Sequence, residues 1–184
     1  MTIQHYMQSN FRPLGAVQII GIFAVLMVCN VLLRYGLRTG YIRRRQMKSL
    51  LALTFYLSLV FLGTVIARKH SVVQFNLTPF SSWVSAFVAL DGEALWSVVL
   101  NVAMFMPIGW LLVTSFRHSP HPAVLVLIGT ALSVTIEFSQ FVFQCGFVEV
   151  DDVINNTLGC ALGIVLKNAV QRAVDGTHAA HGYR

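Results

Sequence analysis

Five runs of apolar residues, separated by short polar stretches, dominate the pattern along the 184-residue chain. About 20 helical residues cross the hydrocarbon core of a bilayer. The first run is too long for the core of a typical signal peptide and has no small-residue cleavage motif, so we expect it to be retained. The pattern therefore predicts an all-α fold, a polytopic bundle of about five transmembrane helices. These helices are expected at residues 13–33, 49–67, 95–116, 122–143 and 153–172.

The segment between the second and third runs, residues 71–94, is too polar to cross a membrane but is partly periodic. Apolar side chains recur at intervals of three and four over residues 80–88, with serines on the opposite side. Thr78-Pro79 fits an N-cap followed by proline at the first helical position. This predicts a short interfacial or re-entrant helix with Trp83 at headgroup level. The alternative is an ordinary loop that packs one face on the bundle.

Composition identifies lipid as the main solvent of this chain. Hydrophobic residues make up 56% and charged residues only 11%, and the mean hydropathy is +0.70, whereas a soluble domain has about 25% charged residues. Six of the thirteen basic residues lie in one short stretch between the first two runs, which indicates a cytoplasmic loop that can contact anionic lipid. We expect no nucleic-acid partner. The six are Arg34, Arg38, Arg43, Arg44, Arg45 and Lys48.

Placing this basic loop in the cytoplasm orients the whole bundle. The N-terminus is then outside and the C-terminus cytoplasmic, as expected for a multi-pass protein of the plasma or inner membrane. Five of the seven acids fall at the outer side: Asp91, Glu93, Glu149, Asp151 and Asp152.

Three cysteines and six histidines occur, but none has the spacing of metal ligands, so we expect no disulfide framework, metal or cofactor.

Glu137 is the most unusual residue, because it lies fifteen residues into the uncharged fourth run. A carboxylate inside a transmembrane helix costs about 2.5–3.5 kcal/mol, so it normally faces protein or water and has a partner. Polar side chains at helical spacing give the fourth span one polar face, and the fifth span has another. The first stripe is Ser133, Glu137, Gln140 and Gln144, and the second is Asp152, Asn156, Gly159 and Gly163.

Structural roles are also open for these residues. Glu137 and Gln140 can form a buried network that holds the helices together, each bond contributing about 0.6–2 kcal/mol. An acid at the start of a helix, such as Asp152, can cap it. Gly159 and Gly163 form a small-xxx-small pair that favours close helix packing. Pro107, in the third span, indicates a kink.

Four segments occur in a diagnostic order: Asn76 to Phe80 (NLTPF), Asn101 to Gly109 (NVAMFMPIG), Glu137 to Gln140 (EFSQ), and Asp151 to Gly159 (DDVINNTLG). They resemble the successive signatures of the VanZ-like family over roughly residues 50–166. The resemblance implies a small integral membrane protein, associated by name with resistance to the glycopeptide antibiotic teicoplanin. Its polar signature carries over to Asn101, Glu137, Gln140, Asp152 and Asn156, which are our candidate binding residues.

The chain departs from the family pattern in two places. Glu149 stands where the family usually has an aspartate, and residues 144–148 lack the arginine that usually precedes the acidic motif. We divide the chain into an added helix with its basic loop (1–48), a VanZ-like membrane domain (49–172) and a short tail (173–184) that we expect to be disordered.

Three classes of function are compatible with this pattern. The first, which we favour, is a protein with an outward-facing polar cleft that binds a lipid-linked cell-wall or polysaccharide intermediate, or another cell-envelope headgroup. The second is a membrane enzyme that uses Glu137 and Asp152 as an acid/base pair on a lipid substrate. The third is a subunit of a proton-linked carrier. The sequence does not determine the oligomeric state.

Overall fold

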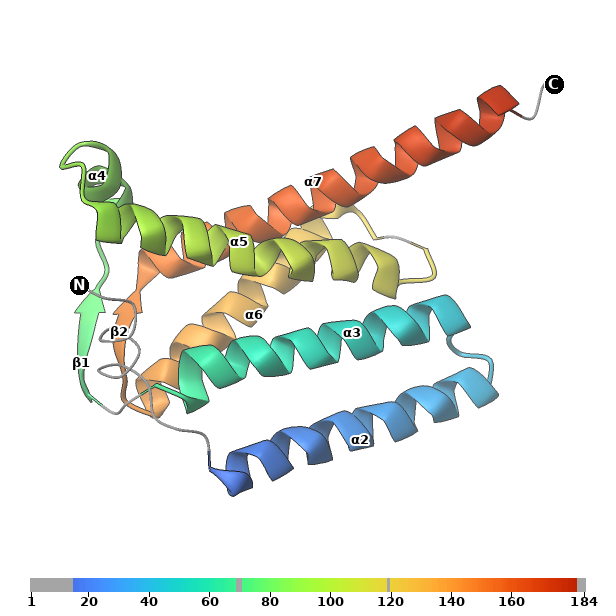
Figure 1. Ribbon diagram of the computed structural model, residues 1–184, viewed down its shortest axis with the longest axis horizontal. Helices are drawn as coiled ribbons and strands as arrows, with labels where there is room; N and C mark the ends of the chain where they lie inside the picture. The colour runs from blue at the N-terminus through green and yellow to red at the C-terminus, as the bar shows by residue number, and fades with distance from the viewer. Residues whose placement is uncertain (1–14, 69–70, 119, 182–184) are drawn as a thin grey trace.

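The computed structural model describes residues 15–68, 71–118 and 120–181. Five helices are long and apolar enough to cross a membrane, and they extend between the two ends of the molecule (Figure 1). The predicted all-α class and the five spans are therefore confirmed. The helices are α2 (Ala16–Arg38), α3 (Arg44–Phe61), which continues into a π-helical turn η1 (Leu62–Ile66), α5 (Gly92–Ser115), α6 (Pro122–Val142) and α7 (Val150–His181).

Several helices are longer than the apolar runs that predicted them. Helix α2 extends to Arg38 and α3 begins at Arg44, so most of the expected basic loop is helical. Helix α7 continues to His181, and the prediction that the tail from residue 173 is disordered is wrong over residues 173–181. Side-chain hydrogen bonds from Lys167 to Gln171 and from Gln171 to Asp175, each between residues four apart, support this polar extension.

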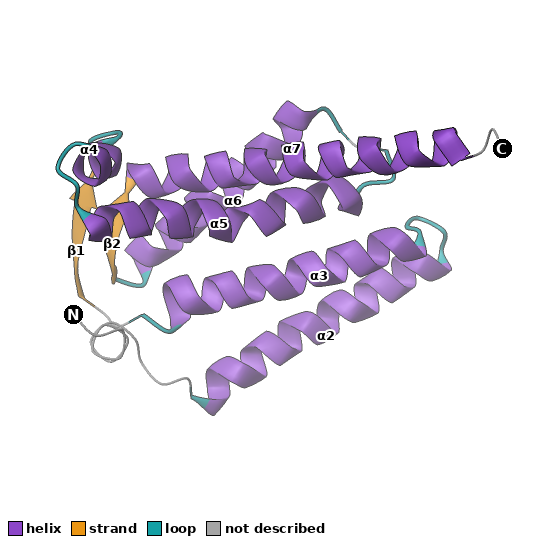
Figure 2. Ribbon diagram, turned by 45° about the horizontal axis from the view of Figure 1, so that its top comes forward, coloured by secondary structure: helices purple, strands orange, loops and turns teal. Residues whose placement is uncertain are grey.

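The predicted short helix is present as α4 (Ser81–Phe87) at one end of the bundle (Figure 2). Its N-cap is Phe80, at a left-handed φ of 63°, so the prediction of a start at Thr78-Pro79 is wrong. The reason is a long-range contact: the backbone N–H of Phe80 donates to the carboxylate of Asp151 in α7. A distant acid thereby takes the role expected of the local threonine.

Two short strands, β1 (Ser71–Asn76) and β2 (Cys145–Glu149), pair in parallel at the same end of the bundle (Figure 2). The sequence analysis did not predict them. The register places Asn76 opposite Glu149. The pair therefore joins the segment after α3 to the connection between α6 and α7, although about 70 residues separate them in the chain.

Helices α5 and α7 form the most extensive helix pair. A Cβ added to Gly159 would overlap the backbone of Val102, and one added to Gly163 would overlap the backbone of Met106. The predicted close packing of these two glycines is therefore confirmed, and it allows the two helix backbones to touch. The core beside them includes Phe105, Ile108, Leu125, Cys160 and Ile164.

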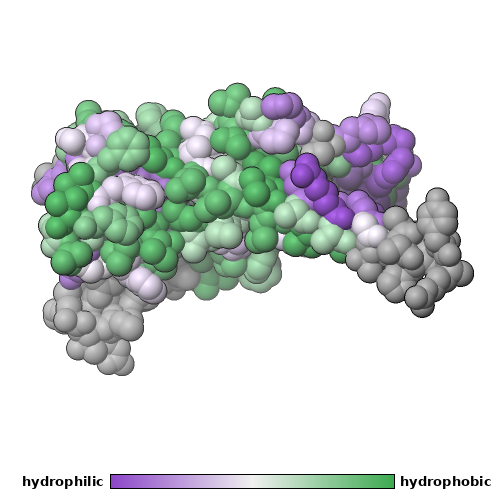
Figure 3. Space-filling view, turned by 90° about the horizontal axis from the view of Figure 1, so that it is seen from above, coloured by the Kyte–Doolittle hydropathy of each residue, from purple (hydrophilic) through white to green (hydrophobic). Residues whose placement is uncertain are grey.

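Helix α2 differs from the other long helices because none of its residues is buried. It packs on α3 along the side of the bundle (Figures 1 and 2). Viewed from above, hydrophobic residues cover most of the molecule and hydrophilic residues gather toward one end (Figure 3). An apolar surface of this kind is suited to contact with lipid.

Candidate functional site

A group of charged and polar side chains lies where α7 begins, near the strands and α4. We call Arg68, Asn101, Glu137, Glu149 and Asp152 the polar centre. Asn101 of α5 donates a hydrogen bond through Nδ2 to Oδ1 of Asp152, in the first turn of α7. The backbone N–H of Glu149 donates to Oε2 of Glu137 at 3.2 Å. Each of the predicted residues Asn101, Glu137 and Asp152 therefore has a partner from another element.

Electrostatic interactions connect these residues further. The carboxyl groups of Glu137, Glu149 and Asp152 lie close enough for their charges to interact. The positive charge of Arg68 attracts all three. Glu137 is 6% exposed, so these forces act in surroundings with little water. The polar centre thus combines three carboxylates with one guanidinium in a small region.

Glu149, in the connection before α7, is the acid of the polar centre that lies outside the membrane-spanning helices. Burial raises the pKa of Glu149, and the nearby charge of Asp151 raises it further, whereas Arg68 lowers it. Glu149 therefore holds its proton more tightly than an exposed glutamate does.

The sequence analysis did not identify Arg68 as a site residue. The expected cation is absent from residues 144–148, but the chain supplies one from the segment before β1. No spacing along the sequence connects Arg68 to the acidic motif. The parallel pairing of β1 with β2 places the two segments together.

The predicted residues Gln140 and Asn156 form hydrogen bonds across two interfaces of α6, one with η1 and one with α7. Gln140 donates through Nε2 to the carbonyl of Thr64 in η1 at 3.1 Å. Asn156 of α7 donates through Nδ2 to Oγ of Ser133, one helical turn before Glu137, at 2.9 Å. The predicted stripes on α6 and α7 therefore meet at Ser133 and Asn156, whereas Gly159 and Gly163 of the second stripe pack on α5.

Three buried polar atoms beside the polar centre have no hydrogen-bond partner within the described residues: Oε1 of Gln140, Nδ2 of Asn155 and Oδ1 of Asn156. All three side chains are at most 3% exposed. An unsatisfied buried polar atom costs about 1–3 kcal/mol, and such atoms in proteins are normally satisfied by water or a bound group. Asn155 was not predicted; its Oδ1 accepts a bond from Nε1 of Trp83 in α4 at 2.8 Å.

Asp151 has a structural role, although it adjoins Asp152 in the chain. Its carboxylate accepts hydrogen bonds from the backbone N–H groups of Phe80 and Ser82, at 2.6 Å each, and from the hydroxyl of Ser81 at 3.1 Å. These bonds cap α4 and dock it on α7. The two neighbouring aspartates are therefore divided, one toward α4 and the other toward α5. In the described part of the chain, no group of three or more His, Cys, Asp or Glu residues is placed to hold a metal ion.

The five apolar helices and their buried polar residues define a multi-pass membrane protein. Comparison with known proteins then identifies its family: a family profile described as VanZ/LLP1 matches residues 47–171, which include the whole polar centre. The chain belongs to the VanZ-like family. It is similar to a protein of Enterococcus faecium named Protein VanZ, with 34% identity over 91 residues. That alignment covers 50% of this chain and 50% of the relative, so the match spans about half the length of the curated protein. No solved structure matches the chain.

Proposed function

We propose that the polar centre binds the headgroup of a lipid-linked or cell-envelope molecule from the outer side of the membrane. The main support is the set of unpartnered buried atoms on Gln140, Asn155 and Asn156, each of which follows Glu137 or Asp152 by one helical turn. One donor and two acceptors are left unsatisfied. A bound polar ligand accounts for them better than a purely structural network does, because such a network would satisfy its own polar atoms.

The chemistry of the polar centre favours a headgroup with both hydrogen-bond donors and an anionic group. Carboxylates such as Glu137 and Asp152 accept hydrogen bonds from sugar hydroxyls or ammonium groups, and the Arg68 guanidinium suits a phosphoryl oxygen or a carboxylate. The amide of Asn101 holds Asp152 in a fixed orientation. A phosphate-linked sugar or amino sugar combines these features.

The charge distribution supports an outward-facing polar centre. The cations at Arg34 to Lys48 lie where α2 ends and α3 begins, and the polar centre lies at the opposite end of the bundle (Figure 1). With the cationic end in the cytoplasm, the acids face outward. In a cysteine-free background, Asp91→Cys should react with an impermeant maleimide on intact cells and Thr39→Cys should not. The reverse labelling would contradict this orientation.

Binding can be measured with the purified protein in nanodiscs and a polyprenyl-diphosphate-linked sugar as the probe. We expect saturable binding that weakens about tenfold or more in Glu137→Gln and in Asp152→Asn, because each loses charge-assisted hydrogen bonds. Glu93→Gln is the matched control: it changes an exposed acid at the start of α5, outside the polar centre, and should bind normally.

Thermal unfolding of each variant shows whether the fold is retained. Absence of saturable binding by the folded wild-type protein would refute the proposal, as would equal binding by all four proteins.

An enzymatic role is the second candidate, because Glu137 and Asp152 lie close enough for their charges to interact, and acid/base catalysis needs two such groups near the substrate. The same incubations, analysed for a cleaved or transferred product, distinguish the two. Turnover that Glu137→Gln abolishes would indicate an enzyme, whereas binding without product would indicate a receptor or accessory protein.

A further inference from the structure

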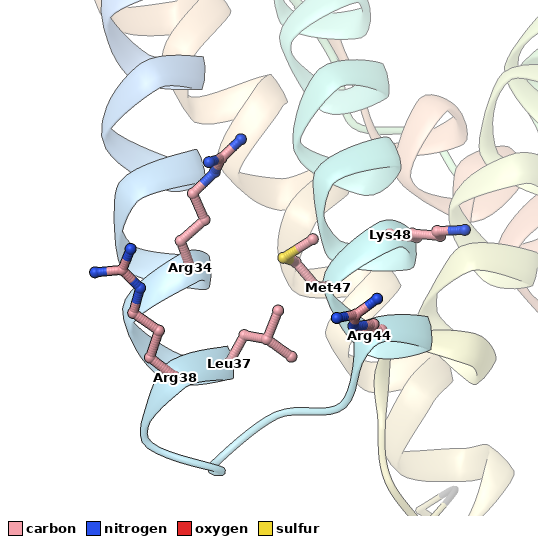
Figure 4. Close-up of a pocket in the computed structure, with 6 residues that line it drawn as sticks. All are labelled: Arg34, Leu37, Arg38, Arg44, Met47 and Lys48. Carbon is pink, nitrogen blue, oxygen red and sulfur yellow. The ribbon is translucent and has the colours of Figure 1, made fainter.

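A second site lies at the other end of the bundle, between α2 and α3, and nothing in the polar centre contributes to it. A cavity of about 370 Å³ opens there, lined by Arg34, Leu37, Arg38, Arg44, Met47 and Lys48 (Figure 4). Four of these six residues are cationic. Leu37 and Met47 point into the space between the two helices, and the side chain of Arg34 extends toward it (Figure 4). Arg44 lies at the start of α3, whereas Arg38 and Lys48 extend outward from their helices (Figure 4).

The same short pattern builds both walls of the cavity. Helix α2 supplies Arg34, Leu37 and Arg38, and α3 supplies Arg44, Met47 and Lys48 in its first turns. In each set the second and third residues follow the first by three and four positions, so each set occupies one helical face. The connection of residues 39–43 reverses the chain and turns the two faces toward each other.

The electrostatics of the cavity favour an anion. No carboxylate lines it, and the hydrogen bond of Arg34 is to the neutral side chain of Asn30, at 2.7 Å. The N-terminus of α3 adds a partial positive charge beside the basic residues. The C-terminus of α2 would oppose this, but the carbonyls of Tyr35 and Gly36 already accept hydrogen bonds from Thr39 and Ile42.

The surroundings favour a lipid over a free ion. Helix α2 has no buried residue, so the groove between α2 and α3 is accessible from the bilayer. Exposed apolar side chains, including Met27 and Val31, continue from the cavity along α2 toward the membrane core. Leu37 and Met47 give the cavity an apolar part. Cations around a partly apolar space at the membrane boundary match a phosphate headgroup and the start of its acyl chains.

We propose that this cavity binds an anionic phospholipid, with its phosphate among Arg34, Arg38, Arg44 and Lys48 and its acyl chains along α2. Such a lipid would fix α2 against α3 and neutralise the cations that the protein itself leaves without carboxylates in the cavity. The site lies outside the polar centre, and α2 lies outside the region matched by the family profile. It therefore stands independently of the function proposed above.

The test is native mass spectrometry of the purified full chain, titrated with phosphatidylglycerol or phosphatidylcholine. We expect selective retention of phosphatidylglycerol. Arg34→Gln/Arg44→Gln should lower it about tenfold or more, because this variant removes two guanidinium groups that line the cavity and would hold the phosphate by charge-assisted hydrogen bonds. Arg43→Gln/Arg45→Gln is the matched control, with the same loss of charge in the same region but at residues that do not line the cavity.

The remaining arms distinguish a site from diffuse attraction. Arg34→Lys/Arg44→Lys keeps the charges and should retain most of the binding. If Arg34→Gln/Arg44→Gln does not fold, Arg38→Gln/Lys48→Gln tests the other cation pair with the same expected loss. Equal losses in the cavity and control variants, equal retention of both lipids, or full competition by inorganic phosphate would each overturn the proposal.

Discussion

Replacing Gly159 with alanine should separate α5 from α7, the helix pair that positions Asn101 against Asp152. A Cβ at residue 159 would lie 3.0 Å from the Cα of Val102, whereas carbon atoms pack best at about 3.5–4.0 Å. It would also overlap the Val102 carbonyl. These opposing atoms are backbone, so no side-chain rotation can relieve the overlap. The helices must therefore move apart by roughly 0.5–1 Å.

The size of the effect follows from two opposing contributions. Overpacking of this kind costs about 1–3 kcal/mol, and replacement of a helical glycine by alanine gains up to about 1 kcal/mol. We expect Gly159→Ala to lower the free energy of unfolding by about 1–2 kcal/mol. Gly21→Ala is the control: nothing lies within 4 Å of its added Cβ, so only the gain in helix propensity remains.

Reversible unfolding in mixed detergent micelles, followed by circular dichroism, measures both variants against the wild-type protein. Because α5 also carries Asn101, Gly159→Ala should in addition weaken binding at the polar centre, and Gly21→Ala should not. If Gly159→Ala were as stable as Gly21→Ala, the two helices could not be in backbone contact at this position.

Three further substitutions test the surroundings of the polar centre. Asp151→Ala removes the acceptor of three hydrogen bonds and should cost about 2–3 kcal/mol; amide exchange in α4 should accelerate, and an unchanged rate would rule out the capping role. The raised pKa of Glu149 means that stability is lost as pH rises through that pKa. Glu149→Gln should therefore have a higher melting temperature than the wild-type protein at and above neutral pH. This difference in melting temperature should shrink as the pH falls toward 4.5, and a difference that grows instead would contradict the raised pKa. Trp83→Phe keeps a ring beside Phe87 but loses the bond to Asn155; we expect a loss of about 1–2 kcal/mol, and unchanged stability would contradict a role for that bond.

Much of the membrane architecture was predictable from the sequence. The lengths of the apolar runs predicted five spans, because a helix must satisfy its own backbone groups in lipid and its length must match the bilayer. Helical spacing also placed Glu137 and Gln140 on a protein-facing side of α6, where both are buried. The same spacing identified Gly159 and Gly163 as packing positions, since small residues are what close helix contact requires.

Features that depend on contacts distant in sequence were decided by the tertiary structure. The pairing of β1 with β2 brings Arg68 to the acids, and Asp151 determines where α4 begins. Asn155 gained significance only through Trp83. Local periodicity specifies which face of an element is apolar or polar, but not which element it meets. Hydrogen bonds and charge interactions act over a few ångströms, so the partners within the polar centre are determined only when the folded chain brings separate segments together.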